Sequence, residues 1–234
     1  MNLFEIAYRK CQLSHHKYEV SLGYLQWLFK DIDFKDKTVL DVGGGRGLYS
    51  YYAKFMGAKR VINLDPFSDG SSGAFLDHTD LEVIHDNSYF QDYSVDEKFD
   101  IIIMHDSINH LDEPMYLKLP YDAEAVKIYR ELILKINNLL NHKGILSISD
   151  CSDNNFFNLL SIKNPFAPSI EWDLHKSPEV LISLIGSKTL RFKKLRWTPF
   201  KRFGFIGRLI SRFGRIPSFF MQSHYNILFE KEDE

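Results

Sequence analysis

Alternating glycines follow a short apolar run near residue 40, in the segment from Asp41 to Gly47 that reads Asp-Val-Gly-Gly-Gly-Arg-Gly. Glycine lacks a Cβ atom, so such a loop lets the main chain approach a ligand closely and adopt conformations that other residues avoid. The run before the loop is typical of a buried strand, and residues 48–56 after it are typical of a helix. A glycine loop between a strand and a helix indicates a binding site of the nucleotide type.

The spacing of the glycines does not fit two familiar nucleotide loops. A dinucleotide-binding loop has the pattern G-x-G-x-x-G, whose third glycine would fall at position 48, where the chain has Leu48. A P-loop needs Gly-Lys-Ser/Thr, and no lysine follows Gly47. A glycine-rich turn without a ligand is disfavoured because three alternate glycines follow a buried strand.

Polar residues also stand where later apolar runs end. Asp65, followed by Pro66, closes the next run, and Asp86 with Asn87 follows the one after it. In open α/β sheets, ligands bind at the carboxyl ends of the strands. We therefore expect these residues to lie near the glycine loop.

A segment rich in histidine and acid follows the most apolar run, residues 99–105, and ends at His110. A positioned histidine or carboxylate can remove a proton from an acceptor group, so His110 and Asp106 are candidate bases. A structural role for His110, bonded to its own loop, is an equal alternative. His105 ends an apolar strand, which favours a packed side chain.

Over roughly residues 37–150, the chain resembles the class I S-adenosylmethionine-dependent methyltransferases. The resemblance is carried by the acidic-x-Gly-x-Gly-x-Gly loop at residues 41–47, by Asp65 after the second strand, and by the segment ending in His110-Leu111 after the fourth. It implies a Rossmann-like methyltransferase fold and S-adenosyl-L-methionine as the cofactor. It also implies that the main chain at the loop glycines passes beneath the methionine and ribose parts of the cofactor.

The family pattern assigns further cofactor contacts by position. Asp41 would lie near the cofactor's amino group, and Asp65 would accept hydrogen bonds from both ribose hydroxyls, because a carboxylate offers two acceptor oxygens. Pro66 and Phe67 would lie beside the adenine, and Asp86 would bind the adenine amino group. The expected cofactor-binding residues are Asp41, Gly43, Gly44, Gly45, Gly47, Asp65, Pro66, Asp86, Asn87 and His105.

Methyl transfer from a sulfonium is an in-line displacement, so the protein mainly aligns the acceptor with an already activated methyl group. A hydroxyl acceptor usually needs a base, whereas a neutral amine needs none. In the family, the region after the fifth strand often covers the acceptor, so Trp172 and His175, together with His110, are expected substrate contacts. An anchoring role for Trp172 in the core is an equal alternative.

A metal is not expected. Metal-dependent catechol-type methyltransferases place Asp after the fourth strand and Asp-Asn after the fifth. Asp106 matches the first position, but Asp150 is followed by Cys151, so the paired motif is broken.

A parallel sheet is needed to bring these residues together. Apolar, β-branched runs alternate with amphipathic segments, an order that predicts a single α/β domain over residues 1–234. We expect a doubly wound, mostly parallel seven-stranded sheet with helices on both faces, an antiparallel last strand and a helical cap over residues 1–35. The expected strands are residues 38–42, 60–65, 81–85, 99–105, 144–149, 190–198 and 224–230. The expected helices lie within residues 3–30 and at 48–56, 121–140 and 177–186.

Residues 199–221, between the last two expected strands, contain five basic residues and no acidic one, interleaved with phenylalanine, leucine and isoleucine. This basic aromatic insert is typical of a membrane-surface element or a clamp for an anionic, partly apolar substrate. Single-stranded nucleic acid is a rival ligand. An amphipathic helix packed on the domain or on a second subunit is an equal alternative.

The whole chain of 234 residues has a net charge of −2, which disfavours a nucleic-acid partner. Two distant cysteines and the lack of a long apolar run favour a cytoplasmic protein. A peripheral contact with the membrane through residues 199–221 stays open, as do a monomer and a homodimer. We expect methyl transfer to a small-molecule or sugar acceptor, free or lipid-linked, on oxygen. A protein or RNA methyltransferase and a non-catalytic cofactor-binding module are the alternatives. Enzymes that methylate amino groups of RNA or DNA usually carry an Asn/Asp-Pro-Pro-aromatic motif, which residues 106–109 lack.

Overall fold

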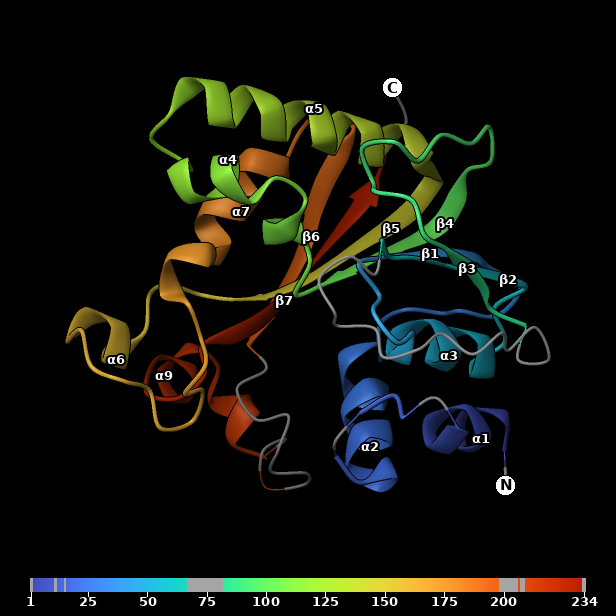
Figure 1. Ribbon diagram of the computed structural model, residues 1–234, viewed down its shortest axis with the longest axis horizontal. Coiled ribbons are helices and arrows are strands. Elements are labelled where there is room, and N and C mark those ends of the chain that lie inside the picture. Colours follow the sequence, from blue (N-terminus) through green and yellow to red (C-terminus); the bar gives the residue numbers. More distant parts are fainter. Residues whose placement is uncertain are drawn as a thin grey trace.

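The computed structural model describes residues 2–10, 12–14, 16–66, 82–197, 206 and 209–232. Within these residues, seven strands form one sheet in the order β3-β2-β1-β4-β5-β7-β6 (Figure 1). The strands are β1 Thr38–Val42, β2 Arg60–Leu64, β3 Ile84–Asp86, β4 Phe99–His105, β5 Leu140–Cys151, β6 Leu190–Trp197 and β7 His224–Lys231.

The five strands from β3 to β5 pair in parallel, and β7 lies antiparallel between β5 and β6. The expected doubly wound sheet with an antiparallel last strand is thus confirmed. Several expected bounds differ from the structure, and two strand starts differ by more than two residues. β3 begins only at Ile84, and β5 begins at Leu140, because that residue already pairs with Phe99 of β4 before an irregularity in the register.

Helices cover both faces of the sheet (Figure 1). One layer holds α1 Leu3–Lys10, α2 Tyr18–Leu28 and α3 Leu48–Phe55, and the other holds α4 Glu113–Lys118, α5 Ala123–Leu139 and α7 Pro178–Ile185. Two apolar cores result, one on each face, because the central strands bury apolar side chains on both sides. The sheet therefore holds the carboxyl ends of β1, β2 and β4 along one edge.

The helix boundaries follow local chemistry. Ser177 precedes α7 and accepts a hydrogen bond from the backbone N–H of Val180, as expected from its place before Pro178. Helix α4 was not predicted, because it has only six residues. It begins after Asp112, whose side chain accepts from the backbone N–H of Met115 at 3.2 Å.

The basic aromatic insert falls partly outside the described residues, including Lys201, Arg202 and Arg208. Its described part contains the 3-10 turn η4 (Ser211–Phe213) and α9 (Arg215–Phe219), which lies beside α6 (Phe156–Leu159) (Figure 1). The Phe156 ring lies 5.3 Å from the Phe220 ring, centroid to centroid. Among the described helices, none is long and apolar enough to cross a membrane.

Candidate functional site

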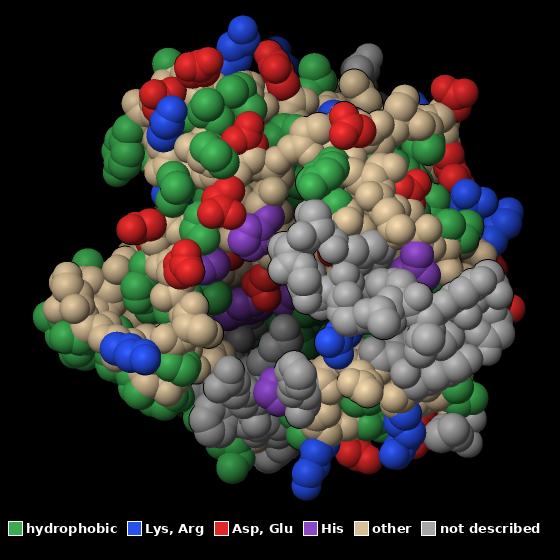
Figure 2. Space-filling model, viewed as in Figure 1, with side chains coloured by type: hydrophobic (Ala, Val, Ile, Leu, Met, Phe, Trp, Pro, Cys, Tyr) green, Lys and Arg blue, Asp and Glu red, His purple; other side chains and the backbone are tan. Residues whose placement is uncertain are grey.

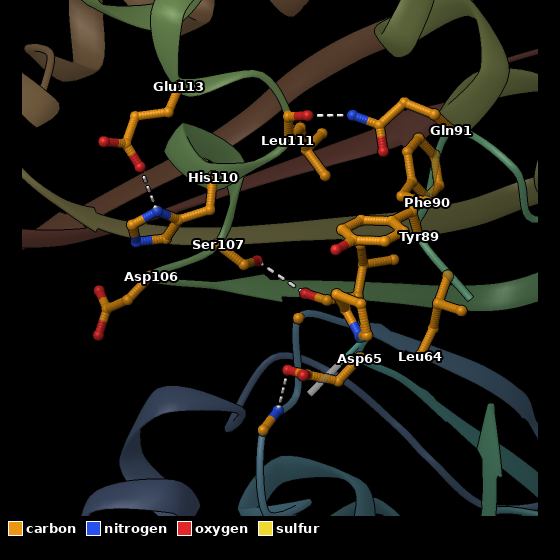
Figure 3. A pocket seen from close by; sticks show the side chains of 14 residues that line it. Leu64, Asp65, Tyr89, Phe90, Gln91, Asp106, Ser107, His110, Leu111 and Glu113 are labelled. Carbon is orange, nitrogen blue, oxygen red and sulfur yellow. Dashed lines mark hydrogen bonds and ion pairs between the residues drawn. The ribbon is translucent and has the colours of Figure 1, made fainter. Parts of the chain in front are cut away.

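A cleft of about 480 Å³ opens at the carboxyl ends of β1, β2 and β4. Gly43 and Gly45 line it from the loop after β1, and Asp65 and Pro66 from the end of β2. Asp106, Ser107, His110 and Leu111 line it from the loop after β4 (Figure 3). Figure 2 shows histidine and acidic side chains in a hollow on one face of the molecule. The volume of the cleft suits a small organic ligand.

Two glycines of the loop are required by their surroundings. Gly43 has a φ of 70°, and a Cβ atom there would overlap the Cβ of Ser107. A Cβ atom on Gly44 would overlap side-chain oxygens of Asp41 and Asn63. The alternating glycines of the motif do not include Gly44, and the structure gives a packing reason for a glycine at that position as well.

Asp65 joins the ends of two strands. Its Oδ2 accepts a hydrogen bond of 2.7 Å from the backbone N–H of Gly45, and its side chain lines the cleft (Figure 3). Asn63, which sequence reasoning did not select, donates to the carbonyl of Gly45 at 2.9 Å. The feature of the sequence that could have identified Asn63 is its polar side chain inside an otherwise apolar strand.

Asp41 lies beneath the loop rather than at the wall of the cleft. Its side chain is fully buried, and its Oδ2 accepts a 2.6 Å hydrogen bond from the Ser50 hydroxyl at the start of α3. Burial raises the pKa of Asp41 to about 7, and the nearby Asp65 adds to the rise, whereas Ser50 opposes it.

The structure does not place Asp86 or Asn87 among the residues that line the cleft. The Asp86 carboxylate accepts from the backbone N–H of Ser88 at 2.9 Å. Tyr89 and Gln91, a few residues further on, do line the cleft, and Gln91 donates to the carbonyl of Leu111 (Figure 3). Phe67 lies outside the described residues.

The loop after β4 is tied to the glycine loop. The Ser107 hydroxyl donates to the carbonyl of Val42 at 2.7 Å. His110 follows in the 3-10 turn η2 (Ile108–His110), with its Nδ1 3.3 Å from Oε2 of Glu113 at the start of α4. Both side chains line the cleft, so the structure brings a histidine and a carboxylate together at its wall.

His105 and His224 flank Asp106. The Nε2 atom of His105 lies 3.2 Å from Oδ2 of Asp106, and the Nε2 atom of His224 lies 3.1 Å from Oδ1. Loss of hydration raises the pKa of Asp106, but the two imidazoles more than offset it and hold the pKa well below its usual value. His105 is buried and does not line the cleft, whereas Asp106 does.

Another contact between a histidine and a carboxylate lies after β5. The Nδ1 atom of His175 is 2.8 Å from Oδ1 of Asp150, and the Tyr116 hydroxyl donates to Oδ2 of Asp150 at 3.3 Å. Burial alone would lower the pKa of His175, but Asp150 raises it overall. Trp172 begins the 3-10 turn η3 (Trp172–Leu174), and neither it nor His175 lines the cleft.

Comparisons with known proteins agree with this arrangement. A family model described as a methyltransferase domain matches residues 13–205. A candidate protein N5-glutamine methyltransferase of Methanocaldococcus jannaschii is 25% identical over 160 residues, which cover 64% of this chain and 80% of the relative.

Two solved structures share the fold. The N-methyltransferase NodS of Bradyrhizobium japonicum, in complex with S-adenosyl-L-homocysteine, is similar over 100% of both chains, with 12% identity and a TM-score of 0.57. An S-adenosylmethionine-dependent methyltransferase of Mesorhizobium loti is similar over 90% of this chain and 100% of its own, with 11% identity and a TM-score of 0.56.

Proposed function

The chain belongs to the class I S-adenosylmethionine-dependent methyltransferases, and we propose that it methylates a hydroxyl oxygen of a small-molecule acceptor such as a sugar or glycan precursor. The single observation that carries this proposal is the pairing of His110 with Glu113 in the same cleft as Asp65. A histidine held by a carboxylate is the group that a hydroxyl acceptor needs.

The cleft fits the cofactor. A Cβ atom on Gly43 would overlap Ser107, so only glycine lets the main chain pack this closely against Ser107 at the wall of the cleft. Asp65, only 8% exposed, presents a carboxylate at the wall and binds the ribose hydroxyls. Pro66 and Tyr89 supply apolar and aromatic surface for the adenine. The bound cofactor supplies the activated methyl group as a sulfonium.

Side chains of this protein would accept the proton that the acceptor hydroxyl loses. Glu113 accepts from Nδ1 of His110, so Nε2 of that ring, which lies 3.4 Å from the side-chain amide nitrogen of Asn109, is the atom that would take the proton of the acceptor hydroxyl. Asp106, on the same wall of the cleft, is the second acidic group within reach of the acceptor. His175, which Asp150 orients in the same manner after β5, and Trp172 lie outside the lining of the cleft, so we assign neither of them a contact with the acceptor.

A nitrogen acceptor is the second candidate. It is favoured by the names of two similar proteins, a candidate protein N5-glutamine methyltransferase and an N-methyltransferase. The loop after β4 disfavours nucleic-acid amines, because it reads Asp-Ser-Ile-Asn without the Pro-Pro-aromatic motif. A neutral amine needs no base, so the two candidates differ in their dependence on His110.

The experiment is a methyl-transfer screen with radiolabelled S-adenosylmethionine over sugars, phenols and amines, run on the wild type and on His110→Gln. We expect transfer to hydroxyl acceptors that falls at least about 100-fold in His110→Gln. Transfer to amines alone, unchanged in His110→Gln, would establish the nitrogen acceptor. Calorimetry with S-adenosylmethionine is run first, and a lack of binding at high micromolar cofactor would contradict the cofactor site.

We infer in addition that the lobe formed by residues 156–166 and 209–222 contacts an anionic membrane surface and so gives access to a lipid-linked acceptor. It exposes apolar side chains on both of its segments, and Lys163 and Arg212 are exposed beside them. Arg215 is less available for lipid, because it pairs with Glu179 at 3.3 Å and lies over the Trp197 ring. The exposed apolar residues are Leu159, Leu160, Ile162, Leu209, Phe213, Ile216 and Phe220.

A further inference from the structure

We propose that His105, Asp106 and His224 form a binding site for one divalent first-row transition-metal ion. In the part of the chain that the structure describes, these residues are the group of three whose ligand atoms all lie within 4.8 Å of one another. The two imidazoles approach the carboxylate with the same atom, Nε2, and each faces a different carboxylate oxygen. Three donors of suitable type therefore converge on one small volume.

The spacing suits a metal ion. Imidazole nitrogens and carboxylate oxygens bind such ions at about 2.0–2.2 Å, so neighbouring ligands on one ion are about 3 Å apart. The distances of 3.2 Å and 3.1 Å between the histidine nitrogens and the Asp106 oxygens are of this size. Two histidines and one carboxylate on one side of the ion form a donor set used by non-haem iron, and the remaining positions stay open.

The fold holds the three ligands in place before any ion binds. His105 ends β4 and His224 begins β7, and these strands lie on either side of β5. Asp106 has a φ of 51°, in the left-handed region that non-glycine residues seldom adopt, and its N–H donates to the carbonyl of Ser149 on β5 at 2.8 Å. The uncommon backbone conformation turns the carboxylate toward the two rings.

The open side of the site faces the cleft. The side chains of His105 and His224 are 4% and 10% exposed, whereas that of Asp106 is 47% exposed and lines the cleft. The ion would thus be bound from the protein side by the histidines and reached from the cleft. An oxygen-bearing acceptor suits the open positions of the ion. This role depends on the proposed function, whereas the metal site itself does not.

Other histidines provide a comparison. His175 meets Asp150 at 2.8 Å and His110 meets Glu113 at 3.3 Å, yet each pair offers a single histidine and a single carboxylate. Two donors do not make such a site, so variants of these histidines are matched controls. The alternative for the cluster of His105, Asp106 and His224 is an ion-free arrangement in which the two imidazoles hydrogen-bond the carboxylate directly.

The test is titration of the chelator-treated full chain with Co²⁺, followed by its visible d–d absorption and by equilibrium dialysis. We expect one ion per chain, with at least a tenfold loss of affinity in Asp106→Asn and in His224→Gln and no change in His175→Gln. Because Asp106 is half exposed, Asp106→Asn is expected to fold even if His224→Gln does not, and circular dichroism checks both.

Absence of Co²⁺ uptake at about 100 μM by the folded wild type would overturn the proposal and establish the ion-free cluster. Uptake that is equal in the wild type and Asp106→Asn would overturn it as well. Binding of S-adenosylmethionine is measured on the same samples without metal, so failure of the metal site and failure of the proposed function are distinguishable.

Discussion

The backbone N–H of Gly45 donates a hydrogen bond of 2.7 Å to Oδ2 of Asp65, and this bond joins the glycine loop after β1 to the end of β2. The two residues follow neighbouring parallel strands, whose last residues, Val42 and Leu64, pair with each other. One carboxylate thus serves both as a tether for the loop and as part of the cleft wall.

Asp65→Ala is therefore expected to weaken binding of S-adenosylmethionine by about 10- to 100-fold, because it removes the tether and the acceptor oxygens for the ribose. Calorimetry measures the dissociation constant. Asp86→Ala is the matched control, since its carboxylate accepts from Ser88 outside the cleft. Equal affinities for the wild type and Asp65→Ala would refute the assignment of Asp65.

Gly43→Ala tests the close approach of the loop to Ser107. A Cβ atom would both strain a φ of 70° and overlap Ser107, so we expect a loss of more than about 1 kcal/mol in the free energy of unfolding and a loss of cofactor binding. Gly57→Ala is the control, because Gly57 also has a positive φ, 96°, but its nearest neighbour lies 3.7 Å away. Urea unfolding measures the free energy of unfolding of both variants. Equal losses in Gly43→Ala and Gly57→Ala would show that backbone strain alone, and not the overlap with Ser107, causes the loss.

His110→Gln is expected to lower kcat for a hydroxyl acceptor by about 10²- to 10⁴-fold with little change in the KM for S-adenosylmethionine, since it removes the base but leaves the cofactor wall intact. Glu113→Gln, which removes the orienting carboxylate, should lower kcat less and shift the pH profile. A His142→Gln control changes an exposed histidine that does not line the cleft. A kcat that is the same in His110→Gln would exclude His110 as the base.

The buried Asp41 makes stability depend on pH. Its pKa in the folded chain, about 7, lies above its ordinary value of 3.8, so the folded state binds the proton more tightly. Its contribution to the free energy of unfolding is full below about pH 4 and is lost as the pH rises to about 7, by about 4 kcal/mol at most. Asp41→Asn should lack this decline and be the more stable protein at pH 8. Urea unfolding from pH 4 to 8 measures both, and parallel curves would contradict the assignment.

The exposed apolar residues of the lobe predict vesicle binding. Phe213→Ser with Ile216→Ser should reduce cosedimentation with anionic phosphatidylglycerol vesicles at least about fivefold, because it removes two large apolar contacts. Tyr121→Ser, at a still more exposed aromatic position between α4 and α5, is the control. Neutralising Arg212 and Arg215 tests the electrostatic part. No binding by the wild type, or equal binding by the double variant, would rule out the membrane contact.

Much of the fold follows from local pattern. The strands at residues 38–42 and 99–105 are where the β-branched runs predict them, and α7 begins directly after its Ser177 cap. The glycine spacing also indicated the type of cofactor, because a tight loop between strand and helix is a local feature. Short elements such as α4 escaped prediction, since six residues carry little periodicity.

The details of the site depended on tertiary structure. Sequence order suggested Asp41 as a cofactor contact, yet the chain buries it beneath the loop against Ser50, and Tyr89 and Gln91 line the cleft where Asp86 was expected. The pairing of His110 with Glu113 needed the turn into α4, which sequence reasoning had not placed.

By itself, then, the sequence determined the order of the strands and the longer helices and the position of the glycine loop, because burial periodicity and turn chemistry act between residues a few positions apart. Only the tertiary structure decided that His224 meets Asp106, 118 residues earlier in the chain. That contact exists because β7 inserts antiparallel between β5 and β6, which carries its first residue to the carboxyl end of β4. The order and register of the strands depend on the packing of the whole chain, and they determine which residues distant in sequence come into contact.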